Sequence, residues 1–252
     1  MIRRAIAATL ASLLFLLPGS FSLSPQNPRE FVGRFERAYR ASKTLQADFF
    51  ERYFENGREV RSEAGVAYFG RPGKMRWEYR SPEPNLYIID GQWAWFYVPA
   101  DHTVTRTRAK ESSDWRTPLA LLAGEMKVSR ICARSEIARG QQPIQADGVV
   151  LSCQLRGSEA GPSAAGNPQA AGTNVLFEVN RGTGELSRIL VSDPGGVQVE
   201  FRFANWKFDP RIDAASFRFE PPRGVAIVDG DFEVKPPANK TAFGAGLAGP
   251  SR

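Results

Sequence analysis

Residues 65–79 read G-V-A-Y-F-G-R-P-G-K-M-R-W-E-Y, and this stretch decides how the 252-residue chain folds. Met75, Trp77 and Tyr79 alternate with charged side chains. A period of two is typical of a strand with one buried face and one face in water. Arg71-Pro72-Gly73, just before this strand, is typical of a turn. The stretch therefore predicts β-strands joined by a short turn.

The same pattern continues along the chain. Trp93, Trp95 and Tyr97 form a second aromatic stripe, and it follows Asp90-Gly91, a dipeptide that favours a tight hairpin. Asn56-Gly57 gives another hairpin signal. We therefore expect an antiparallel meander from about residue 46 to residue 108. Further hairpin strands are expected around residues 174–180, 185–192 and 197–203.

Two helices are expected beside these strands. Asn27 and Pro28 suit the cap and the first position of a helix over residues 28–42, which carries an aromatic stripe at helical spacing, Phe31, Phe35 and Tyr39. A second helix, short and very apolar, is expected to begin at a cap and a proline and to end at Gly124. Its residues are Thr117, Pro118, Leu119, Leu121 and Leu122.

The two ends of the chain differ in composition from its middle. Arg3 and Arg4 precede an apolar run from residue 5 to residue 17, which is typical of a secretory signal peptide and short for a membrane-spanning helix. The alternative is an uncleaved membrane anchor. We expect a signal peptide over residues 1–22, a single domain over residues 23–235 and a flexible tail over residues 236–252. A Gly-, Ala- and Ser-rich insertion is expected at residues 157–172.

The composition supplies little for chemistry and much for a core. The chain holds 17 Phe, 6 Tyr and 5 Trp but a single histidine, and its net charge is +6. It has no dense basic cluster, so nucleic-acid binding is not expected. His102 has no nucleophile motif near it, and the Asp229 and Asp231 carboxylates flank a glycine as in a turn. We therefore expect no enzyme, no metal site and no cofactor.

Cys132 and Cys153 are the chain's two cysteines. An even pair in an oxidising compartment suggests a disulfide, and their placement about Gln142-Pro143 suits facing strands of a hairpin. The alternative is two buried free thiols.

The apolar face of so many strands needs a cover. The two expected helices are the available cover, so the economical solution is one curved, partly closed sheet under a lid of short helices. Beneath the lid there is either a filled core or an apolar cavity.

The quoted stretch resembles the periplasmic outer-membrane lipoprotein carrier family, LolA. The resemblance continues through S-P-E-P-N-L-Y-I-I-D-G at residues 81–91, W-A-W-F-Y-V-P at 93–99 and T-P-L-A-L-L at 117–122. It returns with I-D-A-A-S-F-R-F at residues 212–219 and P-P-R-G-V at 221–225. It implies a mainly β fold with short α-helices, namely an incomplete, unclosed antiparallel β-barrel covered by a lid around a hydrophobic cavity.

The resemblance also implies a function and its residues. A monomeric periplasmic carrier takes acylated lipoproteins from an inner-membrane ABC exporter and delivers them to an outer-membrane receptor lipoprotein. Arg71 is the implied lid latch, which bonds helix carbonyls, and residues 117–122 are the implied lid. The aromatic stripes supply the expected cavity lining: Phe49, Tyr68, Met75, Trp77, Tyr79, Trp93, Trp95 and Tyr97. Met75 stands where the family often has a larger aromatic residue, so a reshaped cavity is expected. The alternative function is a lipid- or lipoprotein-sensing regulator of the same fold that contacts an anti-sigma factor.

Overall fold

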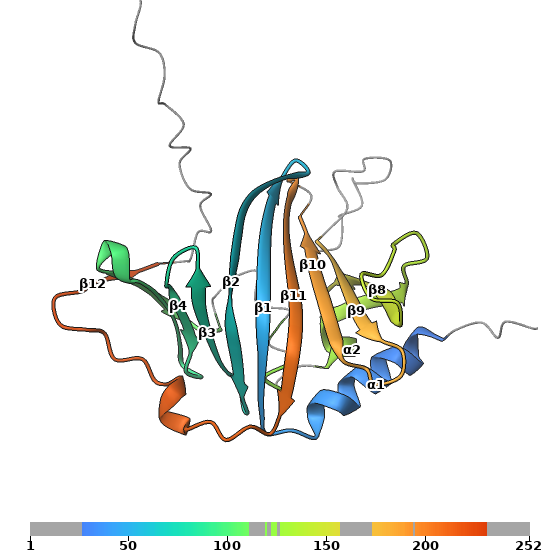
Figure 1. Ribbon diagram of the computed structural model, residues 1–252, viewed down its shortest axis with the longest axis horizontal. Helices are drawn as coiled ribbons and strands as arrows, with labels where there is room; N and C mark the ends of the chain where they lie inside the picture. Colours follow the sequence, from blue (N-terminus) through green and yellow to red (C-terminus); the bar gives the residue numbers. More distant parts are fainter. Residues whose placement is uncertain are drawn as a thin grey trace, which may run out of the picture.

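The computed structural model describes residues 27–110, 119, 122–124, 127–156, 173–193 and 195–230. These residues form one sheet of twelve strands in the order β12-β6-β5-β4-β3-β2-β1-β11-β10-β9-β8-β7 (Figure 1). All neighbouring strands are antiparallel except β12, which runs parallel to β6. Because β12 and β7 are the two ends of this order, the sheet is not closed. The expected mainly β, unclosed architecture is therefore confirmed.

The first six strands are the meander that the sequence predicts, and the remaining strands extend it on both sides. The strands are β1 (Thr44–Glu55), β2 (Arg58–Gly70), β3 (Lys74–Ser81), β4 (Leu86–Ile89), β5 (Trp93–Val98), β6 (Thr103–Arg108), β7 (Cys132–Ile137), β8 (Gly148–Leu155), β9 (Asn174–Asn180), β10 (Leu186–Ser192), β11 (Val197–Phe208) and β12 (Ala226–Asp229). The helices are α1 (Pro28–Arg40) and α2 (Val128–Ile131), with 3-10 turns η1 (Pro99–Asp101) and η5 (Ala214–Phe217).

The predicted hairpin turns form as their residues require. Asn56 and Gly57 both have positive φ, 49° and 77°, as the tight β1–β2 turn demands. At the β4–β5 turn the Asp90 carboxylate accepts hydrogen bonds from the amides of Gln92 and Trp93, at 2.8 and 2.7 Å. These local interactions need no distant partner, which is why the sequence reveals them.

Helix α1 begins where the sequence predicts and ends two residues earlier. The Asn27 side chain accepts a hydrogen bond from the Arg29 amide at 3.0 Å. Figure 1 shows α1 crossing one end of the sheet below β9 and β10. Its buried stripe packs there, with Phe35 6.3 Å from Phe177 between ring centroids and Tyr39 5.1 Å from Trp206.

The helix also lies directly on the β9–β10 turn. Gly184 has a φ of +77°, and a methyl group there would lie 2.7 Å from the backbone carbon of Arg34. The Tyr39 hydroxyl accepts a hydrogen bond from the Leu186 amide at 2.7 Å, and burial raises the pKa of this hydroxyl well above its ordinary value. A glycine at position 184 is therefore what allows the helix to reach the sheet.

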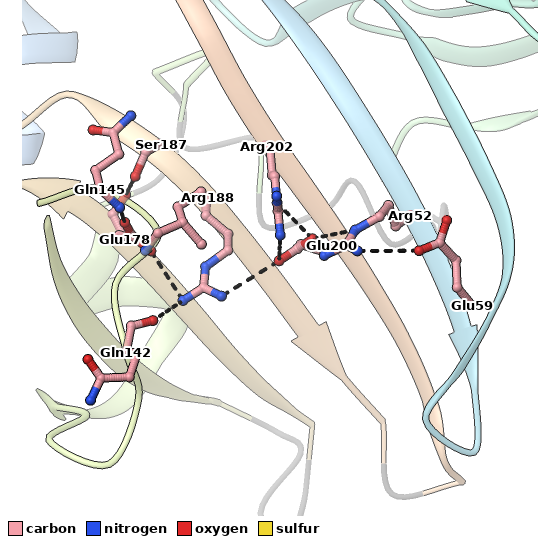
Figure 2. Close-up of polar contacts among 10 residues, drawn as sticks. Arg52, Glu59, Gln142, Gln145, Glu178, Ser187, Arg188, Glu200 and Arg202 are labelled. Carbon is pink, nitrogen blue, oxygen red and sulfur yellow. Dashed lines mark hydrogen bonds and ion pairs between the residues drawn. The ribbon is translucent and has the colours of Figure 1, made fainter.

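A charge network lies on the face of β1, β11, β10 and β9 that points away from α1 (Figure 2). Arg188 lies between two carboxylates, 3.1 Å from Glu178 and 3.6 Å from Glu200. Arg52 and Arg202 donate to the same Glu200 carboxylate at 2.8 and 3.0 Å. The network contains as many cations as anions once Glu59, which pairs with Arg52, is included. Arg188, Glu178 and Glu200 are buried, and their burial is compensated because each has a partner of opposite sign, whereas Arg202 and Glu59 are exposed at the edge of the network.

The same network holds the β7–β8 loop against the sheet. Glu178 is fully buried, and its two oxygens accept hydrogen bonds from the amides of Ile144 and Gln145 at 3.0 and 2.9 Å. Cys132 and Cys153 form a disulfide between β7 and β8. The hairpin is therefore fixed at both ends, by a covalent link and by a buried carboxylate.

Residues 216–219 pack against the meander on the face that carries Arg76 and Trp95, before the chain forms β12. Phe217 packs on Gly70, where a methyl group would lie 2.7 Å from the Phe217 ring. Asp229 then pairs with Arg106 at 2.6 Å. The expected signal peptide and tail lie outside the described residues, as does the 157–172 insertion. Within the described part of the chain, no helix is both long and apolar enough to cross a membrane.

Replacing Gly184 by alanine should lower the free energy of unfolding by about 2 kcal/mol or more, since the new methyl group meets the α1 backbone at a positive φ. Denaturant unfolding monitored by tryptophan fluorescence measures this change. Gly182→Ala is the matched control in the same turn, because a methyl group at residue 182 has its nearest neighbour at 3.5 Å. Equal stability of the two variants would contradict the close helix–turn contact.

Glu178→Gln should destabilise the fold by about 3 kcal/mol, because it leaves the buried Arg188 charge with a weakened partner. Glu136→Gln removes the same charge from an exposed pair with Arg134, and should cost less than about 0.5 kcal/mol. Thermal unfolding of both variants measures the difference. Similar losses in the two variants would show that the network is not desolvated as described.

Candidate functional site: the inner apolar face of the sheet

The inner face is defined here as the side of the sheet that carries Phe49, Trp77 and Phe201. Trp77 is at its centre, with ring centroids 4.7 Å from Phe49 and 5.6 Å from Phe201. Phe69 and Tyr79 complete the ring cluster, 5.8 Å from Trp77 and 5.1 Å from Phe49 respectively. Trp77 is fully buried and Phe49 is 3% exposed. In this state the rings contact one another and expose almost no surface to water.

The strand register divides the eight expected lining residues between two faces. Four of them lie on the inner face: Phe49, Met75, Trp77 and Tyr79. Four lie on the outer face: Tyr68, Trp93, Trp95 and Tyr97. Residues that are paired across neighbouring strands lie on the same face of the sheet. Arg76 is paired with Tyr68 and with Ile88, and Ile88 is paired with Trp95, so Tyr68 and Trp95 lie on the face of Arg76, opposite Met75 and Trp77. The expectation that all eight share one lining is therefore corrected.

The outer four have partners of their own. The Trp95 indole donates to the Asp90 carboxylate at 2.9 Å, and Trp95 and Tyr97 pack against Phe219 at 5.5 and 5.8 Å. The Arg108 guanidinium lies 3.9 Å above the Trp93 ring. Tyr68 lies beside Glu78, and its pKa is raised by burial and then by this carboxylate. None of the four contributes to the inner face.

Glu51 is a charged residue of the inner face that the sequence analysis did not single out. It pairs across the strands with Phe201 and Glu63 and is 4% exposed. The Tyr79 hydroxyl donates a hydrogen bond to its carboxylate at 2.8 Å. The sequence does allow this placement to be predicted, because Glu51 follows Phe49 by two residues in the same strand and therefore lies on the same face. The apolar face therefore carries a buried polar position.

A cover segment, defined here as Leu119 and residues 122–124, lies over this face. Leu119 and Leu122 are buried within the same core cluster as the inner-face rings. The Leu122 amide donates to the Leu119 carbonyl at 2.9 Å, and the Gly73 amide donates to the Ala123 carbonyl at 3.3 Å. Thr117, Pro118 and Leu121, also expected in this lid helix, lie outside the described residues.

Arg71 lies where the cover segment meets α1. Its guanidinium donates to the Arg40 carbonyl at 3.0 Å and to the Tyr39 carbonyl. Gly124, with a φ of +84°, lies against the same group, since a methyl group there would be 2.8 Å from the guanidinium carbon. Burial lowers the pKa of Arg71, and the charge of Arg40 lowers it further. The carbonyls that Arg71 bonds are those at the end of α1, a helix terminus where a cation is favourable.

The residues considered for catalysis lie apart from this face. His102 has a φ of 49° in the turn after η1 and is exposed, and Asp229 is bound to Arg106. Asp231 lies outside the described residues. In the portion of the chain that the structure describes, no group of three or more His, Cys, Asp or Glu side chains could hold a metal ion.

In a comparison with known sequences, two parts of this chain each match a protein family. Residues 40–144 match the family described as outer membrane lipoprotein carrier protein LolA. Residues 186–241 match a family described as predicted periplasmic protein, DUF2092. The periplasmic assignment agrees with the export signal that the sequence predicts.

Individual relatives extend the match to most of the chain. A protein of Chromobacterium violaceum named outer-membrane lipoprotein carrier protein is 31% identical over 195 residues, which are 75% of this chain and 83% of the relative. A protein of the same name from Dechloromonas aromatica is 28% identical over 190 residues, which are 74% of this chain and 82% of the relative.

A crystal structure of an uncharacterized conserved protein from Thermus thermophilus has the same fold. It is 14% identical, with a TM-score of 0.50 over 81% of this chain and all of that one. The fold, the two matched families and the extent of the relatives agree, and the chain belongs to the LolA family of periplasmic outer-membrane lipoprotein carrier proteins.

Proposed function

We propose that this protein carries lipoproteins through the periplasm and shields their acyl chains on its inner apolar face. The observation that carries the proposal is the aromatic cluster around Trp77, which, among the described residues, shares its core with α1 and the cover segment rather than with a second sheet. Short segments can move aside while the hydrogen-bonded sheet stays intact. The relatives' name, outer-membrane lipoprotein carrier protein, agrees with this role.

The energetics of acyl chains require such a cover. Each buried CH₂ is worth about 0.8 kcal/mol, so one 16-carbon chain represents roughly 10 kcal/mol. A permanently open face would bind such chains too tightly to release them. In the described state Leu119 is fully buried and Trp77 has no exposed surface. Acyl chains must therefore displace the cover, and the free energy of opening is subtracted from their affinity.

Arg71 is the contact that we assign to the closed state. It bonds the last carbonyls of α1 and lies against Gly124 of the cover segment. Moving α1 away from Arg71 would leave a partly desolvated cation without its acceptors. Since hydrogen bonds to charged groups are stronger than neutral ones, loss of this contact favours the open state.

The partners follow from the direction of transport. An inner-membrane ABC exporter would supply the acylated lipoprotein, and an outer-membrane receptor lipoprotein would accept it. The carrier acts as a monomer. Carriage makes and breaks no covalent bond, so it requires neither a catalytic residue nor a cofactor.

Mass spectrometry of the full-length protein purified from the periplasm tests the function directly. We expect co-purified acylated lipoproteins, in amounts that increase when transfer to the outer membrane is blocked. Recovery of an anti-sigma factor instead would favour the regulatory alternative. Recovery of neither would contradict both functions.

Arg71→Leu should fold normally but stall delivery, because the open state that holds acyl chains becomes more favourable. We expect transfer to outer-membrane acceptors to slow at least tenfold, while the amount of bound lipoprotein increases. Arg80→Leu is the matched control, since the Arg80 side chain is 62% exposed and pairs with Glu78 at 3.5 Å, away from α1. Wild-type transfer by Arg71→Leu would exclude the latch.

A further inference from the structure

The short helix α2 is capped by a residue of another helix. Its own cap residue, Lys127, makes no side-chain hydrogen bond to the helix. The first amide of α2, that of Val128, instead donates to the Glu36 carboxylate of α1 at 3.1 Å. The first amides of a helix have no partner within the helix, and a carboxylate is the favoured acceptor there. Glu36 thus links α1 to α2, although it is 92 residues from Val128 in the chain.

Glu36 also belongs to the group of contacts around Arg71. Its second oxygen pairs with the Arg40 side chain at 2.9 Å, and the Arg40 carbonyl accepts the hydrogen bond from Arg71. Arg71 in turn lies against Gly124 of the cover segment. The end of α1 is therefore held by Arg71 on the side of the cover segment and by Glu36 on the side of α2.

The contact between Glu36 and Val128 matters because of the position of α2 in the chain. Helix α2 follows the cover segment closely and leads directly into β7 at Cys132. Cys132 is fixed to β8 by the disulfide. The chain is thus fixed to the sheet at Cys132, eight residues after Gly124 of the cover segment. Val128 lies just before that attachment, at the point where a side chain of α1 holds the main chain.

We propose that Glu36 is a positioning residue that holds the cover closed, and that it sets the affinity of the inner face for acyl chains together with Arg71. The inference rests on the proposed function, because it concerns access to the same face. The Glu36 side chain is 20% exposed, so its bonds are partly shielded from water. Losing its carboxylate removes the acceptor of the Val128 amide and releases the start of α2, four residues after Gly124 of the cover segment.

The same helix offers a matched control. Glu30 forms an equivalent pair with Arg34, also four residues apart, at the other end of α1. Arg34 donates to the Arg181 carbonyl in the β9–β10 turn, so this pair faces the sheet end and not the cover. Glu30→Ala removes a similar contribution to helix stability, whereas Glu36→Ala removes the contact with α2 as well.

The experiment titrates full-length protein with pyrene-labelled palmitate and follows fluorescence, for wild type, Glu36→Ala, Glu36→Gln and Glu30→Ala. Hydrogen exchange at the Val128 amide is measured on the same samples. We expect Glu36→Ala to bind the probe about tenfold more tightly, because less free energy is spent on opening, and to exchange Val128 faster. Glu36→Gln retains an acceptor for Val128 and should stay within about threefold of wild type. Glu30→Ala should match wild type in both measurements.

The outcomes separate this inference from the proposed function. If every protein binds the probe with the same affinity, carriage stands and the role of Glu36 is excluded. Equal tightening in Glu30→Ala and Glu36→Ala would also exclude it, since the cause would then be general weakening of α1. If no protein binds the probe, the acyl-binding face itself is contradicted, and this inference falls with it.

Discussion

The structure depends on one constraint, which is that the aromatic inner face of a wide sheet must be kept from water. Trp77 and the rings around it form a continuous apolar surface across β1, β2, β3 and β11. A second sheet would bury it permanently. Here α1 and the cover segment do so instead, through side chains that join the same core. Arg71 and Glu36 make polar contacts at the end of α1 that lies beside this cover.

The two faces of the sheet are stabilised in different ways. The inner face is held by apolar contacts, which are not directional and tolerate replacement of one partner by another. The outer face carries buried ion pairs centred on Arg188, Glu178 and Glu200, and these require fixed geometry. The network and the disulfide hold the β7–β9 region rigid. Under the proposed function, movement would be confined to the segments that cover the inner face.

Prediction from the sequence succeeded where interactions are local. Asn56-Gly57 and Asp90-Gly91 impose their turns through backbone geometry alone, and the period of two in residues 75–79 gives the face of each residue within a strand. Prediction was wrong about which residues of different strands share a face of the sheet. Trp93, Trp95 and Tyr97 alternate just as Met75, Trp77 and Tyr79 do, yet they point to the opposite side. The number of residues in each turn sets the register, and a shift of one residue exchanges the faces.

The sequence by itself therefore determined the strands other than β12, the hairpin turns, α1 and the family, since these rest on neighbouring residues or on a motif read in order. Only the tertiary structure decided which aromatic stripe forms the inner face and that Glu36 joins Arg71, which the resemblance already implied, at the end of α1. Glu36 and Val128 are 92 residues apart, and nothing local to either indicates their contact. Arg71 reaches α1 only because β2 returns the chain to the start of β1. Such pairings depend on how the whole sheet brings distant segments together, and no periodicity in the sequence records them.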